Sequence, residues 1–229
     1  MKILSVDTAT KSCSVAIVDK EALLAEITIL SGQTHAKHLM SMINKVVGMS
    51  GLKITDLDGY ATTRGPGTFT GLRIGISTVK GLAVASGKPI VGVSSLDALA
   101  MQTFPSSYLI CSILDARRGE VYCSRYRIDN RIMKKEGDEQ VLSPAKAVRD
   151  INEPCVFIGN GVVLYHKLIE DTLGGLAYFA PFFQNTIRAS TVAYLSMDRF
   201  EKNDTDDVSM FVPRYIRKSD AELNFRAKE

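Results

Sequence analysis

The sequence predicts an α/β fold of two lobes, in which mixed sheets are flanked by helices. Residues 1–104 carry strand patterns followed by helices that alternate with strands, an order typical of a mixed sheet covered on its faces. The second half repeats this order in a shorter form, without any repeat of residues. With 229 residues, of which 45% are hydrophobic and 23% charged, the chain has room for one large or two small domains. We place the boundary at the polar break 104–107 and expect lobes at 1–105 and 106–229.

The first lobe is expected to open with a strand meander and to continue with alternating helices and strands. Strands are predicted at residues 2–7, 13–18, 22–29, 59–63 and 89–93. Helices are predicted at residues 34–49, at 94–103, and from position 68 or 70 to about 86. Thr34 and either Thr68 or Thr70 stand where a helix needs an N-cap, and Gly51 follows the first helix as its terminator.

The second lobe is expected to begin with a hairpin that has a polar tip. Strands are predicted at residues 108–114, 120–128, 131–142 and 156–158. Helices are predicted from Ser143-Pro144, from about 161 to 172, and at 190–200. The final stretch 203–229 is charged apart from residues 208–216, and we expect its end to be mobile.

A glycine-rich loop joins the strand at 59–63 to the longest predicted helix. It consists of Arg64, Gly65, Pro66, Gly67, Thr68, Phe69, Thr70, Gly71, Leu72, Arg73, Ile74 and Gly75. A helix N-terminus attracts phosphate because its first N–H groups are unpaired, but a P-loop also requires Lys and then Ser or Thr after its last glycine. Gly71 is followed by Leu72 instead, and the glycine spacing differs from the dinucleotide fingerprint.

The helix after this loop carries two rows of small residues at a spacing of four. One row is Gly71, Gly75 and Val79, and the other is Ser77, Gly81 and Ala85. Glycine inside a helix costs about 1 kcal/mol relative to alanine, so these rows indicate the close approach of another backbone. That neighbour is either the protein's own sheet or a partner helix, and with two rows both can apply.

The loop at residues 64–75 closely resembles the signature of the TsaB (YeaZ) family. Further matches to the family follow in order along the chain: Asp7-Thr8-Ala9-Thr10, Asp115-Ala116-Arg117-Arg118-Gly119-Glu120-Val121-Tyr122 and Pro213-Arg214-Tyr215-Ile216-Arg217. The resemblance covers nearly the whole chain, with a looser match at residues 130–210. It implies an actin-like (ASKHA, RNase H-like) fold of two lobes.

The resemblance also implies a function and partners. Members of the family act in the synthesis of N6-threonylcarbamoyladenosine at position 37 of tRNAs that read ANN codons, as the non-catalytic companion of the related subunit TsaD. The ATPase TsaE joins the assembly, and homodimers use the same helices. We expect this chain to dock on TsaD through a face made of Leu39, Met42, Ile43, Val46, Gly71, Gly75 and Thr78. Contact with tRNA is expected to be indirect or contributory.

The metal site of the catalytic relatives is altered in this chain. Those relatives hold a metal with an H-x-x-x-H pair after a Gly-Val strand end, and the resemblance places Ser95 and Leu99 at the histidine positions. Leucine has no donor atom and serine is a poor ligand, so we expect no metal and no intrinsic cofactor; ATP or ADP and the metal are expected on the partner subunits. His35 and His38 can share a helix face, but residues 27–55 contain no Asp or Glu to complete a site.

An independent actin-like nucleotide-binding ATPase is the alternative function. Asp7 ends the first strand, where actin-like folds aim a carboxylate at a nucleotide-bound metal, but it can equally close the turn with Thr8 and Thr10. Arg117 and Arg118 at the hairpin tip either grip a phosphate or stay solvated beside acidic neighbours. A protease is not indicated, because the sequence contains neither G-x-S-x-G nor H-E-x-x-H.

Charge and cysteine usage limit the partners and the compartment. A net charge of +3 does not indicate autonomous nucleic-acid binding, although Arg214, Arg217 and Lys218 could contribute a contact with tRNA. The cysteines are scattered without a C-x-x-C pair, which predicts reduced thiols. No apolar run reaches the roughly 18 residues that a membrane span needs, and we expect a cytoplasmic protein.

Overall fold

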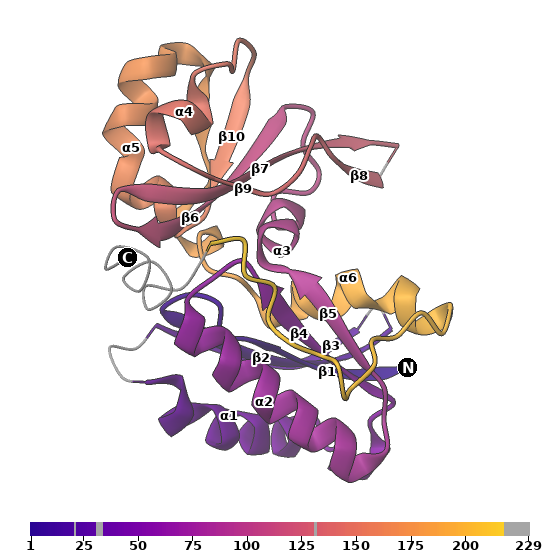
Figure 1. The fold of residues 1–229 in the computed structure, drawn as a ribbon. Coiled ribbons are helices and arrows are strands. Elements are labelled where there is room, and N and C mark those ends of the chain that lie inside the picture. The colour runs from indigo at the N-terminus through magenta and orange to yellow at the C-terminus, as the bar shows by residue number, and fades with distance from the viewer. Residues whose placement is uncertain (21, 31–33, 131, 218–229) are drawn as a thin grey trace, which may run out of the picture.

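The computed structural model describes residues 1–217 apart from 21, 31–33 and 131, and contains two mixed sheets (Figure 1). The first sheet has the strand order β3-β2-β1-β4-β5. Its strands are β1 (Lys2–Asp7), β2 (Ser12–Asp19), β3 (Ala22–Leu30), β4 (Gly59–Gly65) and β5 (Ile90–Ser94). Because β1 pairs antiparallel with β2 and parallel with β4, the sheet is mixed, as predicted.

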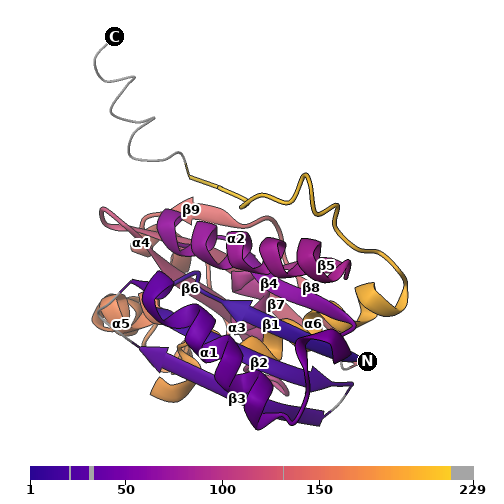
Figure 2. The same ribbon diagram turned by 90° about the horizontal axis from the view of Figure 1, so that it is seen from below.

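Helices cover both faces of this first sheet. α1 (His35–Met49) and α2 (Phe69–Ser86) lie next to each other on one face, and α6 (Ala189–Glu201) packs on the other (Figure 2). The apolar residues of α1 and α2 recur at the spacing of one helix face, and that face is buried. Thr34 and Thr68 occupy the N-cap positions, but neither side chain makes a capping hydrogen bond. No helix within the described ranges is long and apolar enough to cross a membrane.

The second sheet has the order β11-β10-β6-β7-β8, and β9 also pairs with β7. Its strands are β6 (Leu109–Arg117), β7 (Glu120–Asp129), β8 (Ile132–Lys135), β9 (Gln140–Leu142), β10 (Cys155–Ile158) and β11 (Ala177–Phe179). The remaining helices are α3 (Ser95–Met101), α4 (Pro144–Val148) and α5 (Asn160–Leu173), with short 3-10 turns η1 (Ile54–Asp56), η2 (Gly174–Leu176) and η3 (Phe182–Gln184). β11 was not predicted, because its short run shows no clear alternation.

The single strand expected over residues 131–142 is wrong, since two strands form there. β8 and β9 both pair antiparallel with β7. Between them Gly137 adopts a φ of +104°, a left-handed value that strand geometry does not accommodate. The N–H of Glu136 donates to the carbonyl of Arg125 at 2.8 Å, which fixes the break in place.

The chain returns to the first sheet after the second sheet is complete. Ser5 Oγ donates to the carbonyl of Ala189 at 2.7 Å, and the N–H of Ala189 donates to Ser14 Oγ at 2.9 Å. These bonds hold the start of α6 on the first sheet, and α6 packs along β1, β2, β4 and β5. The expected division at residue 105 separates the two sheets, but it assigns α6 to the second lobe, whereas α6 packs mainly along the first sheet. Its small apolar residues fit the uncovered face of the first sheet instead.

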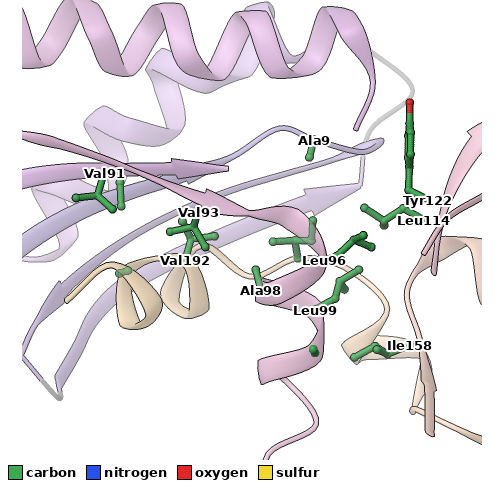
Figure 3. Packing of buried hydrophobic residues seen from close by; sticks show 14 of the residues in the cluster. Ala9, Val91, Val93, Leu96, Ala98, Leu99, Leu114, Tyr122, Ile158 and Val192 are labelled. Carbon is green, nitrogen blue, oxygen red and sulfur yellow. The ribbon is translucent and has the colours of Figure 1, made fainter. Parts of the chain in front are cut away.

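A shared hydrophobic core joins the two halves, with α3 at its centre (Figure 3). Leu96 and Leu99 of α3 are fully buried in one cluster with Leu114 and Ile158 of the second sheet and Val192 of α6. Full burial of one such side chain contributes about 1.5–3 kcal/mol. The two halves are therefore held together by packing.

Candidate functional site

The sequence motifs meet at one end of the first sheet, beside the tip of the β6–β7 hairpin. The turn after β1, the glycine-rich loop, the hairpin tip and the segment after α6 contact one another there. Figure 1 shows that segment running from α6 back along β5 and α2 to this end. We name this arrangement the motif cluster, and it comprises residues 7–10, 64–75, 115–120 and 213–217.

The glycine-rich loop packs directly on the backbone of the β1–β2 turn. The N–H of Thr68 donates to the carbonyl of Ala9 at 2.7 Å, and Thr8 Oγ1 donates to the carbonyl of Gly71 at 2.8 Å. A Cβ atom at Gly67 would lie 2.5 Å from the Ala9 carbonyl oxygen, and one at Gly71 would overlap the Thr8 carbonyl. Both glycines are thus explained by close backbone approach. The N–H of Thr68 is already used within the protein, which removes one donor from a phosphate cradle.

Asp7 lies beneath this loop and is fully buried. Its Oδ1 accepts from Thr63 Oγ1 at 2.8 Å and from the N–H of Ala9 at 3.2 Å, which is the turn-closing geometry. Burial raises the pKa of the Asp7 carboxyl to about 7, against the smaller lowering by these two hydrogen bonds. Contact between Asp7 and a nucleotide-bound metal would require the carboxylate to be uncovered.

The segment after α6 pairs with the start of the glycine-rich loop. The N–H of Arg214 donates to the carbonyl of Arg64 at 2.8 Å, and a Cβ atom at Gly65 would lie 2.5 Å from the Arg214 carbonyl oxygen. The Arg64 guanidinium reaches Asp206 at 3.3 Å and lies 5.1 Å from the centre of the Phe211 ring, which is buried. The sequence analysis did not predict that this segment packs against the glycine-rich loop, although the largely apolar stretch 208–216 indicated that part of the segment is buried.

An exposed stack of side chains marks the N-terminal end of α2. The ring of Phe69 stacks on Tyr215 with centroids 4.8 Å apart, and the Arg73 guanidinium carbon lies 3.7 Å from the centre of the Phe69 ring. Arg73 Nε donates to the hydroxyl of Tyr215 at 3.0 Å. Phe69 and Tyr215 are 38% and 40% exposed, so this stack faces solvent.

The hairpin tip is tied to the same C-terminal segment. Arg117 and Arg118 both adopt positive φ values, and the N–H of Arg117 donates to Asp115 Oδ1 at 2.7 Å. The guanidinium of Arg217 donates to the carbonyl of Ala116 and pairs with a neighbouring glutamate of β7 at 3.5 Å. Arg117 and Arg118 are exposed. Exposure agrees both with phosphate binding and with a solvated turn, so the two alternatives for these arginines remain open. The predicted contact of Lys218 lies outside the described residues.

The face expected to dock on TsaD points inward and packs on the protein's own sheet. Buried members of that set are Leu39, Met42, Ile43, Val46, Gly71 and Gly75, and only Thr78 is half-buried. A Cβ atom at Gly75 would overlap Thr8 Oγ1, so this row exists for contact with the β1–β2 turn. The expected docking face is therefore wrong, because the most apolar side of each helix is the side that the sheet covers.

The second row of small residues on α2 faces outward. Ser77, Gly81 and Ala85 are exposed, and a Cβ atom at Gly81 would have no other atom within 4 Å. On α1, Gly48 is equally open. The large exposed apolar residues of the two helices are Met40, Met49, Phe69 and Val84.

The positions related to a metal site lie in the core. Ser95 and Leu99 are both fully buried, and Ser94 caps α3 by accepting from the N–H groups of the residues two and three positions later. Within the described part of the chain, no group of three or more His, Cys, Asp or Glu could hold a metal. His35 Nε2 lies 2.8 Å from the Thr10 carbonyl oxygen, and His38 Nε2 is buried. The cysteines are buried and reduced.

Comparison with known proteins identifies the family. The family model described as "TsaD: tRNA N6-adenosine threonylcarbamoyltransferase" matches residues 26–225. The "tRNA threonylcarbamoyladenosine biosynthesis protein TsaB" of Bacillus subtilis is 30% identical over 98% of each chain. The chain belongs to the TsaB (YeaZ) family. The protein of the same name from Escherichia coli is 35% identical, covering 70% of this chain and 72% of that protein.

Solved structures support the same assignment and define the fold. "YeaZ from Pseudomonas aeruginosa" superposes with a TM-score of 0.80 at 26% identity, covering 94% of this chain and 99% of that one. The activator of the 2-hydroxyisocaproyl-CoA dehydratase from Clostridium difficile superposes with a TM-score of 0.53 at 13% identity, covering 89% and 97%. That second likeness concerns the fold alone. This TsaB-family chain has the actin-like (ASKHA) fold that the sequence resemblance implied.

The signature residues of this TsaB-family chain act mainly on its own backbone. Gly65, Gly67, Gly71 and Gly75 each allow another chain segment to approach more closely than a side chain would. Arg64 and Arg73 hold the C-terminal segment through its carbonyl, carboxylate and aromatic groups. The motif cluster thus mainly holds together segments that are distant in the sequence. Only its exposed side chains are available to contact a partner.

Proposed function

We propose that this chain acts in the synthesis of N6-threonylcarbamoyladenosine in tRNA, as a non-catalytic subunit that docks on TsaD. Curated relatives that match most of the chain carry this biosynthesis in their names. The observation that most supports a non-catalytic role is that Ser95 and Leu99, which the resemblance places at the histidine positions of the catalytic relatives, are buried in the core. In this proposal the modified base is at position 37 of ANN-reading tRNAs, TsaD and TsaE supply the nucleotide and metal, and the site of action is the cytoplasm.

The docking surface in this proposal is the outward side of α1 and α2 (Figure 2). Gly48 and Gly81 are open there, so a partner helix can approach both backbones closely and gain dispersion energy over a wide contact. Exposed Met40 and Val84 supply apolar area beside them. A second copy of the chain can use the same side, so we expect a homodimer when TsaD is absent.

The test is size-exclusion chromatography with light scattering, on the chain alone and mixed with TsaD of the same organism. Gly81→Arg should remove the heterodimer, because the new side chain projects from the docking side. Gly175→Arg is the matched control, since a Cβ atom there also meets no atom within 4 Å but lies after α5 on the second lobe. A Gly81→Arg protein that still forms the heterodimer would exclude this surface. Failure of the unmodified chain to bind TsaD would overturn the proposed function.

Catalysis is tested by reconstitution with TsaD and TsaE. Formation of the modified nucleoside, measured by mass spectrometry of digested tRNA, should require this chain and should survive the Gly175→Arg control. Purified chain that hydrolyses ATP rapidly without its partners would favour the independent ATPase instead. Asp7→Asn would then abolish that turnover, whereas it should leave docking on TsaD unchanged.

A further inference from the structure

Exposed arginine and aromatic side chains gather on the outer side of the motif cluster. The exposed arginines come from three segments that are distant in sequence: Arg73 from α2, Arg117 and Arg118 from the hairpin tip, and Arg214 from the C-terminal segment. The side chain of Arg217 is only 14% exposed and serves to tie that segment to the hairpin tip. The bonds described above join these segments, since Arg217 contacts the backbone of the hairpin tip and Tyr215 contacts α2. Arginines that are scattered in the sequence therefore form one surface.

The aromatic part of this surface is held in a fixed geometry. The planes of Phe69 and Tyr215 are inclined by only 23°, and the Arg73 guanidinium carbon lies 3.7 Å from the centre of the Phe69 ring. The hydrogen bond from Arg73 to the Tyr215 hydroxyl limits rotation of both side chains. Because the rings are ordered before any ligand arrives, a planar group can stack on them with little further loss of conformational entropy.

The charge of this surface is only partly neutralised. Arg217 pairs with Glu120 at 3.5 Å, and Arg214 lies 3.7 Å from Glu139. Glu139 also pairs with Lys135 at 3.0 Å, so its charge is shared between two cations, and the side chain of Arg214 is 58% exposed. For Arg73 the described contacts are to rings and a hydroxyl group, and they include no carboxylate. The surface therefore presents positive charge next to open aromatic rings.

We propose that this surface binds single-stranded RNA, with bases stacking on the Phe69–Tyr215 rings and phosphates contacting the surrounding arginines. Single-stranded RNA is recognised by this combination, because every base has a face that stacks and every linkage carries a charge. An acidic peptide would use the arginines but would gain nothing from the ordered rings. The inference rests on the proposed function, since the tRNA pathway is what makes the loop of a tRNA the natural occupant.

The experiment is fluorescence anisotropy with a labelled anticodon stem-loop from an ANN-reading tRNA, compared with a labelled RNA duplex. The full chain is tested alone and in complex with TsaD, at several salt concentrations. The stem-loop should bind more tightly than the duplex, and Tyr215→Ala should weaken stem-loop binding by roughly tenfold through the lost stacking. Tyr215→Phe keeps the ring and should bind within about twofold of the unmodified chain. Arg73→Ala should lower the slope of affinity against salt by about one.

Matched controls separate this surface from a general effect of charge or ring loss. Arg149→Ala removes an arginine that is 74% exposed on the second lobe, and Tyr194→Ala removes a tyrosine that is 60% exposed on α6. Both should bind the stem-loop like the unmodified chain, and thermal unfolding verifies that each variant is folded.

Several outcomes would overturn the inference. Equal affinity for the stem-loop and the duplex would contradict it. Full displacement of the stem-loop by poly-glutamate at matched charge would also contradict it, as would Tyr215→Ala and Arg73→Ala variants that both bind the stem-loop as tightly as the unmodified chain. Docking on TsaD is read separately by light scattering. An unmodified chain that forms the heterodimer but does not bind the stem-loop therefore rejects this surface alone, whereas an unmodified chain that binds the stem-loop but not TsaD rejects the proposed function alone.

Discussion

The two sides of α2 carry the same kinds of residue in opposite surroundings. On the inner side, Gly71 and Gly75 lie so close to the β1–β2 turn that an added Cβ atom would overlap Thr8. On the outer side, an added Cβ atom at Gly81 would touch nothing. Close packing within the chain explains the first row, and it leaves the second row without a structural reason inside the monomer. The outer row is therefore the one that a partner can explain.

The largest expected effect extends this comparison to the segment after α6. Phe211 is buried beside Gly92 and Arg64, whereas the preceding Met210 is 72% exposed. Phe211→Ala should lower the free energy of unfolding by about 3–5 kcal/mol, because it leaves a cavity in a packed site. Met210→Ala should change it by less than about 0.5 kcal/mol. Urea unfolding followed by circular dichroism measures both, and equal effects would show that this segment does not pack as described.

A pH-dependent effect is expected from the buried carboxyl group on the inner side. Asp7 has a pKa of about 7 in the folded protein and an ordinary value of 3.8, so between these values only the folded state keeps the proton. The stability that this proton contributes is complete below 3.8 and is lost as the pH rises through 7. Asp7→Asn keeps an acceptor for Thr63 and Ala9 but removes this titration.

Relative to Asp7→Asn, the unmodified chain should therefore lose roughly 4 kcal/mol of unfolding free energy between about pH 4 and about pH 8. Urea unfolding of both proteins across this range measures the difference, and titrations that both proteins share cancel in it. A constant difference across the range would show that Asp7 is ionised in the folded protein at low pH.

A methyl group added to the inner row should destabilise the fold. Gly71→Ala forces the new Cβ atom against the Thr8 carbonyl and to within 2.5 Å of Thr68 Oγ1. Because one of these neighbours is backbone, the loop or the turn has to move, at a cost of about 2–3 kcal/mol. The midpoint of urea unfolding should fall with an unchanged slope. A stability equal to that of the unmodified chain would mean that the β1–β2 turn can move at little cost. Close packing would then no longer explain why the inner row of α2 contains glycine.

Much of this fold could be predicted from the sequence, because local patterns determine local structure. The strand meander, the loop that opens α2, and the hairpin with Arg117 and Arg118 at its tip each follow from residues close together in the chain. The direction in which each glycine row faces could not be predicted from the sequence. Gly71 and Gly81 have the same local pattern, and only the position of the β1–β2 turn distinguishes them.

The site also depends on contacts between residues that are distant in the sequence. The apolar residues 208–216 were visible, but the sequence does not show that Phe211 packs beside Gly92 or that Tyr215 stacks on Phe69. Such pairs are set by how α6 returns to the first sheet. The family resemblance suggested the proposed function, and the packing of α1 and α2 on the first sheet moved the proposed docking surface to their outer side.

The smallest expected effect has the opposite sign and is the most direct test of the outer row. Gly81→Ala adds a methyl group where the structure has open space, and alanine reduces the backbone freedom of the unfolded chain. The free energy of unfolding of the isolated chain should rise by about 0.5–1 kcal/mol, a shift of about 2 °C in melting temperature. A natural chain that gains stability so easily has another use for glycine at this position. If that use is contact with a partner helix, the same variant should bind TsaD more weakly while melting at a higher temperature. A variant that is more stable and binds TsaD as well as the unmodified chain would separate Gly81 from the docking surface.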